Sequence, residues 1–147
     1  MLFRKYNSIP KYQVYNNALM TAYKGRTFEK DRIDSKVWGR WVESAVGAYL
    51  LGMAKELGYQ LYYWREGDDE VDSIIANDGE SIAIEVKNGR KGMNSGLPKF
   101  VKAFHPKHSF VVGTSGVSLE DFLSGDLDAL IHWEQPFSHK PMYILCK

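Results

Sequence analysis

Residues 70–87 read EVDSIIANDGESIAIEVK, two apolar-rich runs on either side of Asp78-Gly79. An Asp-Gly pair between alternating runs is among the strongest short-range signals for a two-residue β-hairpin. We therefore predict strands over residues 70–77 and 81–87, in which positions equally distant from the turn face each other. A shift of the turn by one residue would change every pair.

The predicted register brings charged side chains together. Asp72 is expected to face Glu85, and Glu70 is expected to face Lys87. Because successive side chains of a strand point to opposite faces, Asp72, Glu85 and Lys87 share one face. The opposite face, which we expect to be core, carries Ile82, Ile84 and Val86.

Directly opposed carboxylates destabilise a hairpin unless a cation compensates them. Mg²⁺, or Mn²⁺ in its place, suits two carboxylates because it keeps several waters and takes further ligands from phosphate. Lys87 is placed to orient or activate an attacking water and to stabilise charge on phosphorus. Without metal, Asp72→Asn is then expected to be as stable as the native sequence or slightly more so. The alternative is an edge hairpin whose charges simply face water.

A long helix is predicted before the hairpin. Apolar residues recur at helical spacing from Trp38 to Leu57, between a Ser35 cap and a Gly58 stop. This stripe is expected to pack as core.

Glu43 lies at the border of that apolar stripe, and the residues four before and four after it are Gly39 and Gly47. Each glycine costs a helix roughly 1 kcal/mol relative to alanine, so we expect another group to approach the bare backbone closely. Glu43 is the third candidate carboxylate. The alternative is tight packing of helix on sheet with Glu43 at its solvated margin.

The remaining pattern predicts one α/β domain with the order helix, three strands, helix, strand, helix. The additional elements are a strand over 60–65, a helix over 97–104 opened by Pro98, a strand over 110–113, and a helix over 119–123 capped by Ser118. Residues 1–34 are expected to be an irregular lead-in that packs on the core, and residues 35–147 are the domain. Within the lead-in, Asn16-Asn17 could cap residues 18–22. Beyond Asp126 only an apolar stretch at 142–145 can be placed.

Composition adds few constraints on function. The net charge is +1, and the single cysteine, Cys146, cannot form an internal disulfide. No apolar run is long enough for a signal peptide or a membrane span, so a cytoplasmic protein is expected. A basic stretch follows the acidic hairpin, and within it we predict that Arg90, Lys91, Lys99 and Lys102 contact nucleic-acid phosphates. The alternative is that these are ordinary solubilising side chains.

Glu70-Val71-Asp72, the Asp-Gly turn and Ile84-Glu85-Val86-Lys87, preceded by a helix with Glu43, resemble the PD-(D/E)xK nuclease superfamily. The resemblance implies a restriction-endonuclease-like core, a central mixed sheet of about four strands flanked by helices. It implies catalysis by Glu43, Asp72, Glu85 and Lys87, with the three carboxylates as metal ligands. The implied activity is metal-dependent hydrolysis of phosphodiester bonds, with DNA as the expected substrate.

More narrowly, residues 39–50 (GRWVESAVGAYL) and 118–123 (SLEDFL) resemble the C-terminal domain of prokaryotic AAA-type ATPases, over roughly residues 8–125. An ATPase module is therefore the expected partner. The sequence contains no Gly-x-x-x-x-Gly-Lys-Ser/Thr pattern, so any ATP dependence lies elsewhere. The lead-in also has asparagine where that family often has aspartate. A catalytically silent module that binds nucleic acid or a protein partner for an ATPase is the alternative function.

Overall fold

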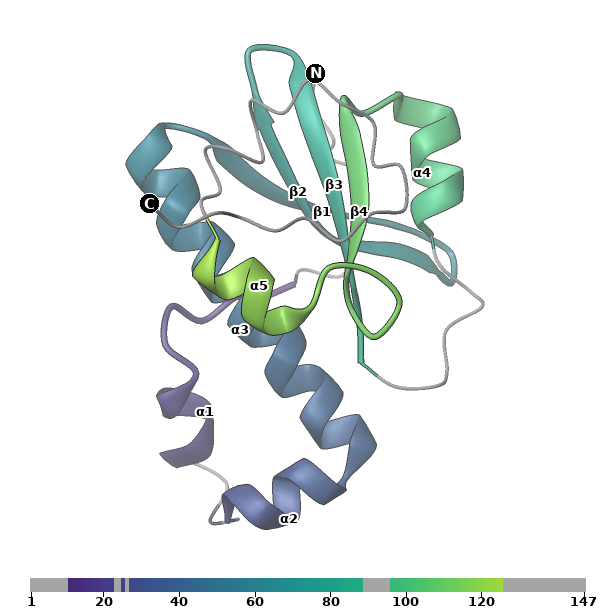
Figure 1. Ribbon diagram of the computed structural model, residues 1–147. Coiled ribbons are helices and arrows are strands. Elements are labelled where there is room, and N and C mark those ends of the chain that lie inside the picture. The colour runs from purple at the N-terminus through teal and green to yellow at the C-terminus, as the bar shows by residue number, and fades with distance from the viewer. Residues whose placement is uncertain (1–10, 23–24, 26, 89–95, 126–147) are drawn as a thin grey trace.

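The computed structural model describes residues 11–22, 25, 27–88 and 96–125 (Figure 1). At its centre lies a four-stranded sheet whose strands are neighbours in sequence order. β1 pairs antiparallel with β2, β2 antiparallel with β3, and β3 parallel with β4, so the predicted mixed sheet flanked by helices is confirmed. The strands are β1 Gln60–Glu66, β2 Asp69–Asn77, β3 Glu80–Lys87 and β4 His108–Gly113.

The hairpin of β2 and β3 has the predicted register. Its ladder runs from Asn77 opposite Glu80 to Ser73 opposite Ile84. Asp78 and Gly79 both have positive φ, 47° and 87°, as a two-residue turn with a matching twist requires. The turn chemistry therefore sets which side chains of β3 face each side of the sheet.

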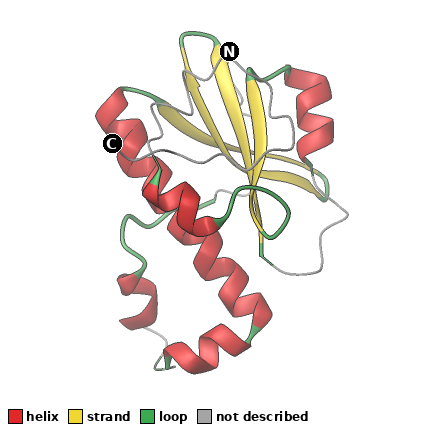
Figure 2. Ribbon diagram, in the orientation of Figure 1, coloured by secondary structure: helices red, strands yellow, loops and turns green. Residues whose placement is uncertain are grey.

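One face of the sheet packs against α3 Ser35–Leu57. Val46 and Leu50 of this helix lie in one buried cluster with Ile82 and Ile84, which confirms the predicted core face of β3. The predicted cap was wrong by one residue, since the side chain of Asp34, not Ser35, accepts hydrogen bonds from the first turn. α5 Leu119–Ser124 completes this layer beside α3 (Figure 2).

The other face of the sheet is covered by α4 Leu97–Phe104. Phe100 is fully buried there, in a cluster with Trp64, Ile74 and Ala83. The division into one core face and one face for chemistry is therefore corrected, because both faces carry core over the middle of the sheet. Any site must lie where the strands leave that packed region.

In the part of the chain that the structure describes, two short helices precede α3. α1 Ala18–Ala22 begins after Asn16, whose side chain accepts a hydrogen bond from the Ala18 N–H. Both α1 and α2 Phe28–Ile33 fall in the stretch that we predicted as irregular, so that prediction was wrong for these residues. α2 is held by a contact with α3, since buried Asp31 accepts a hydrogen bond from the Trp41 indole N–H at 3.1 Å. The predicted apolar stretch at 142–145 lies outside the described residues. None of the described helices combines the length and the apolar character that crossing a membrane demands.

Candidate functional site

Asp72 lies where β2 departs from regular pairing. Tyr62 pairs with Ile74, but Trp64 pairs with Val71, so β2 has one residue more than β1 in between. This is a β-bulge, a device that re-aims side chains. In place of the expected contact across the ladder with Glu85, Asp72 Oδ2 accepts a hydrogen bond of 2.8 Å from the backbone N–H of Val86.

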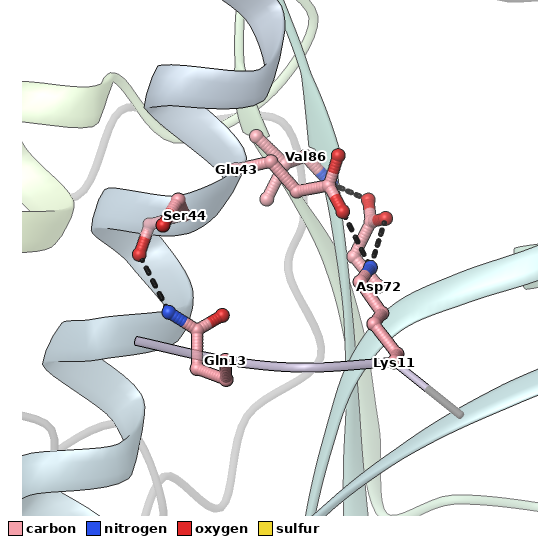
Figure 3. A network of polar contacts seen from close by, with 6 residues as sticks. All are labelled: Lys11, Gln13, Glu43, Ser44, Asp72 and Val86. Atoms are coloured by element: carbon pink, nitrogen blue, oxygen red, sulfur yellow. Dashed lines mark hydrogen bonds and ion pairs between the residues drawn. The ribbon is translucent and has the colours of Figure 1, made fainter. Parts of the chain in front are cut away.

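The second oxygen of Asp72 contacts a lysine that was not predicted. Lys11 Nζ lies 3.3 Å from Asp72 Oδ1 and also forms an ion pair with Glu43 Oε1 of α3 (Figure 3). The Asp72 side chain is only 9% exposed, and those of Lys11 and Glu43 are about one-third exposed. Two of the four predicted catalytic residues are therefore joined by a single ammonium group.

The electrostatics of this cluster are those of two carboxylates that share one cation. Burial raises the pKa of Glu43, and so does the charge of Asp72, while Lys11 offsets part of the rise. Burial alone would lower the pKa of Lys11, but attraction to Asp72 and Glu43 outweighs it and the pKa is raised. Lys11 is accordingly a firmly charged ammonium in this position.

The other two predicted residues also form a pair. Lys87 Nζ lies 2.6 Å from Glu85 Oε1, and the side chains are 19% and 4% exposed. The carbonyl of Lys87 accepts hydrogen bonds from the N–H of Thr114, at 2.9 Å, and from its hydroxyl, at 3.3 Å. A Cβ at Gly113 would lie 2.0 Å from that carbonyl oxygen, so glycine permits the close approach of this turn to the end of β3. The backbone of Lys87 is thereby fixed.

The two pairs adjoin at Val86, whose N–H binds Asp72 and whose neighbours in the chain are Glu85 and Lys87. Glu43 and Asp72 already converge on one cation, and two hard carboxylate oxygens fit the habits of Mg²⁺. Three carboxylates do not gather: the described residues include no group of three or more His, Cys, Asp or Glu side chains placed to hold a metal ion. The residues that fit a metal are thus Glu43 and Asp72, while Glu85 is turned to Lys87.

The segment that delivers Lys11, residues 11–17, is here called the strap. Gln13 Nε2 donates to the carbonyl of Ser44 at 2.9 Å, and a Cβ on Gly47 would lie 2.1 Å from Gln13 Oε1. The predicted close approach to Glu43's flanking glycines is therefore confirmed at Gly47. At Gly39 no such group is found among the described residues. Gly47 was thus the one local sign of the strap in the sequence.

Residues 38–128, more than half of the chain, match the family model of a domain of unknown function, DUF4143. The chain belongs to the DUF4143 family. Domains of this family are typically found with AAA ATPases, which agrees with the narrower of the two resemblances. No curated protein and no solved structure matches the chain. The PD-(D/E)xK assignment stays a prediction.

The matched range of the DUF4143 domain includes all four predicted catalytic residues, Glu43, Asp72, Glu85 and Lys87, whereas the strap precedes it. Lys11 and Gln13 therefore come from outside the matched region and yet contact α3 and β2 within it.

The predicted phosphate-binding residues of the DUF4143 domain differ in their surroundings. Lys99 Nζ lies 3.0 Å from Asp69 Oδ2 and 3.5 Å from Glu66 Oε2, and the hydrogen bond to Asp69 raises its pKa. Lys102, one turn along α4, is exposed. Arg90 and Lys91 lie outside the described residues. Of the described pair, Lys102 is the better candidate for a phosphate contact, because the charge of Lys99 is already compensated.

Proposed function

We propose that this DUF4143 domain is a metal-dependent phosphodiesterase of the PD-(D/E)xK type that acts on nucleic acid, with DNA as the substrate. One observation carries the proposal: the carboxylates of Glu43 and Asp72 both contact the ammonium of Lys11. This position lies directly beside β3, the strand that carries Lys87. Two carboxylates around one cation are the protein ligands that Mg²⁺ commonly uses when phosphate and water complete its shell.

Glu43 and Asp72 would hold the metal, Mg²⁺ or Mn²⁺. Such an ion, when bound, polarises a phosphoryl oxygen and makes a bound water more acidic. Asp72 is oriented for this role because its Oδ2 is fixed by the Val86 N–H, which turns Oδ1 toward Glu43 and Lys11. Glu85 is the third ligand expected from the superfamily. In the present geometry it positions Lys87, and a role on the metal would require it to turn from that ammonium.

Lys87 is the residue that we assign to the attacking water and to the charge that develops on phosphorus. Its ammonium forms an ion pair with Glu85, and its backbone carbonyl accepts a hydrogen bond from the N–H of Thr114. A group of this kind contributes more when it is held in place before the reaction, because no reorganisation is needed as charge develops.

A second candidate function is a catalytically silent nuclease-like module that binds nucleic acid or a protein for an ATPase. It is favoured by the position of Lys11, which already compensates the two carboxylates that a metal would need. In either case we propose that the domain works with an AAA-type ATPase, because the family is typically found with such proteins.

A cleavage assay tests the proposal. Labelled single-stranded and duplex DNA is incubated with the protein in EDTA, in Mg²⁺ and in Mn²⁺, and melting temperatures are recorded under the same conditions. We expect cleavage only with metal, and its loss in Lys87→Met while the metal-induced rise in Tm remains. The matched control is Lys55→Met, an exposed lysine in the last turn of α3, which should behave as the native protein. If DNA is bound but stays intact with either metal, and neither metal raises Tm, the silent module is the correct function.

A further inference from the structure

We infer that Lys11 is a built-in counter-ion that a divalent cation must displace from Glu43 and Asp72. Binding of the cation and release of the strap would then be a single equilibrium. This inference rests on the proposed metal site and adds to it a residue from outside the region that defines the family.

The charges require this exchange. Lys11 Nζ contacts Glu43 Oε1 and Asp72 Oδ1, which are the oxygens that face the shared cation position (Figure 3). A divalent ion bound to both oxygens would stand next to the ammonium group, and the two cations would repel each other. The divalent ion also neutralises both carboxylates, so Lys11 would lose the attraction that holds it there.

The strap is seated on α3 by specific contacts. Gln13 Nε2 donates to the Ser44 carbonyl, and Asn17 Nδ2 donates to the Trp41 carbonyl at 3.3 Å. Gly47 makes room for Gln13, since a Cβ there would overlap the Gln13 side chain. The seat is therefore complementary to the strap, and the side chains of Gln13 and Asn17 hold the strap where the Lys11 ammonium meets the carboxylates.

Release of the strap around Lys11 would expose little apolar surface. Tyr12 is 89% exposed and Tyr15 is 66% exposed while the strap is docked. Docking thus depends mainly on polar and ionic contacts, which are the contacts that a competing cation weakens. An apolar anchor would have resisted displacement, because its burial does not depend on charge.

The coupling has a measurable sign. A ligand that binds only the undocked form has its affinity reduced by the fraction of molecules that are undocked, and any change that favours undocking raises the affinity. Lys11→Met removes the ammonium but keeps most of the side-chain length. We expect it to bind Mn²⁺ and Mg²⁺ roughly tenfold more tightly than the native protein.

Isothermal calorimetry on the full chain measures this directly, with Mn²⁺ and then Mg²⁺ titrated into metal-free protein. The charge control is Lys55→Met, which removes one positive charge from the last turn of α3 and should leave the affinity within about twofold.

A second variant keeps every charge in place. Gly47→Ala puts a Cβ 2.1 Å from Gln13 Oε1, so it should displace the Gln13 amide from the Ser44 carbonyl and weaken the seat of the strap. Gly39→Ala makes the same change in the same helix where no described atom lies within 4 Å. Gly47→Ala should therefore bind metal more tightly than Gly39→Ala. This comparison decides the question even if Lys11→Met does not fold.

The outcomes separate the two proposals. Tighter binding by Lys11→Met and by Gly47→Ala supports displacement. Equal affinity in the native protein and both strap variants overturns the inference and leaves the metal site standing. Weaker binding by the strap variants also overturns it, because Lys11 would then assist the metal. If no variant binds either metal, the proposed metal site fails and the inference fails with it.

Discussion

Replacement of Asp72 by asparagine separates the two roles that the geometry assigns to this carboxylate. Asn keeps the volume of the side chain and can still accept a hydrogen bond from Val86, but it no longer attracts Lys11. The predicted register placed Asp72 opposite Glu85, so loss of the repulsion between them was expected to leave the metal-free variant as stable as the native protein or more so. The observed network reverses that sign.

The magnitude follows from the contacts that change. A hydrogen bond to a charged acceptor contributes about 1.5–3 kcal/mol and a neutral one about 0.5–1.5 kcal/mol, so the bond to Val86 weakens by about 1 kcal/mol. The partly exposed contact with Lys11 adds up to about 1 kcal/mol, and relief of repulsion with Glu43 returns a fraction of this. In EDTA we expect Asp72→Asn to be less stable by about 1–2 kcal/mol, which lowers Tm by roughly 3–8 °C in a chain of this size.

With metal the difference should grow. An ion at a hundred times its Kd stabilises the native protein by about 2.7 kcal/mol, and the variant should lose most of this increment because an amide neutralises no charge on the ion. The assay is a pair of thermal melts, in EDTA and in millimolar Mg²⁺. The control is Asp78→Asn, at the exposed turn of the same hairpin, where asparagine suits the positive φ of 47°. Native-like stability in EDTA would refute the contacts of Asp72 with Lys11 and Val86. A full metal response in the variant would refute Asp72 as a ligand.

Two further predictions concern the α4 side of the sheet. Lys102→Ala should weaken DNA binding and reduce the slope of log affinity against log salt concentration by roughly one. Lys99→Ala should change both less, because Asp69 and Glu66 already compensate that charge. DNA titrations across a salt series measure this, and equal losses of affinity in the two variants would contradict it. Phe100→Ala should cost about 3–5 kcal/mol, since Phe100 is fully buried against Trp64 and Phe104, while Phe28→Ala at a 59% exposed position should cost far less. Urea unfolding of the two variants decides it, and similar costs would mean that this face is not core.

The elements that could be predicted depend on signals contained within their own sequence. Asp78-Gly79 specifies a turn in which both residues have positive φ, and that turn sets the register from Asn77 to Ser73. The helical spacing of α3 likewise needs no information from other parts of the chain, and its left-handed Gly58 ends it where expected. Such features follow from short-range chemistry, which one sequence contains in full.

The features that were missed depend on contacts between distant residues. The bulge at Asp72 exists relative to β1, and pairing positions outward from one turn cannot reveal it. α2 has a polar sequence, and its buried Asp31 accepts a hydrogen bond from the Trp41 indole of α3. Glu85 is also buried, and the register of one hairpin does not predict that burial.

Lys11 is the residue of the site that the sequence argument did not identify. Paired carboxylates require a compensating cation, and a metal ion was the compensator that the hairpin alone suggested. In the structure Asp72 is compensated, together with Glu43, by a lysine 61 residues away in the chain, and Glu85 is compensated by Lys87. Register and periodicity relate only residues of one element or of paired strands, so they could not identify it. Gly47 was the available clue, because a helix accepts the cost of a buried mid-helix glycine where another segment must lie against it. Strand register therefore indicates that Asp72 needs a compensating cation, and in the structure the ammonium of Lys11 is that cation.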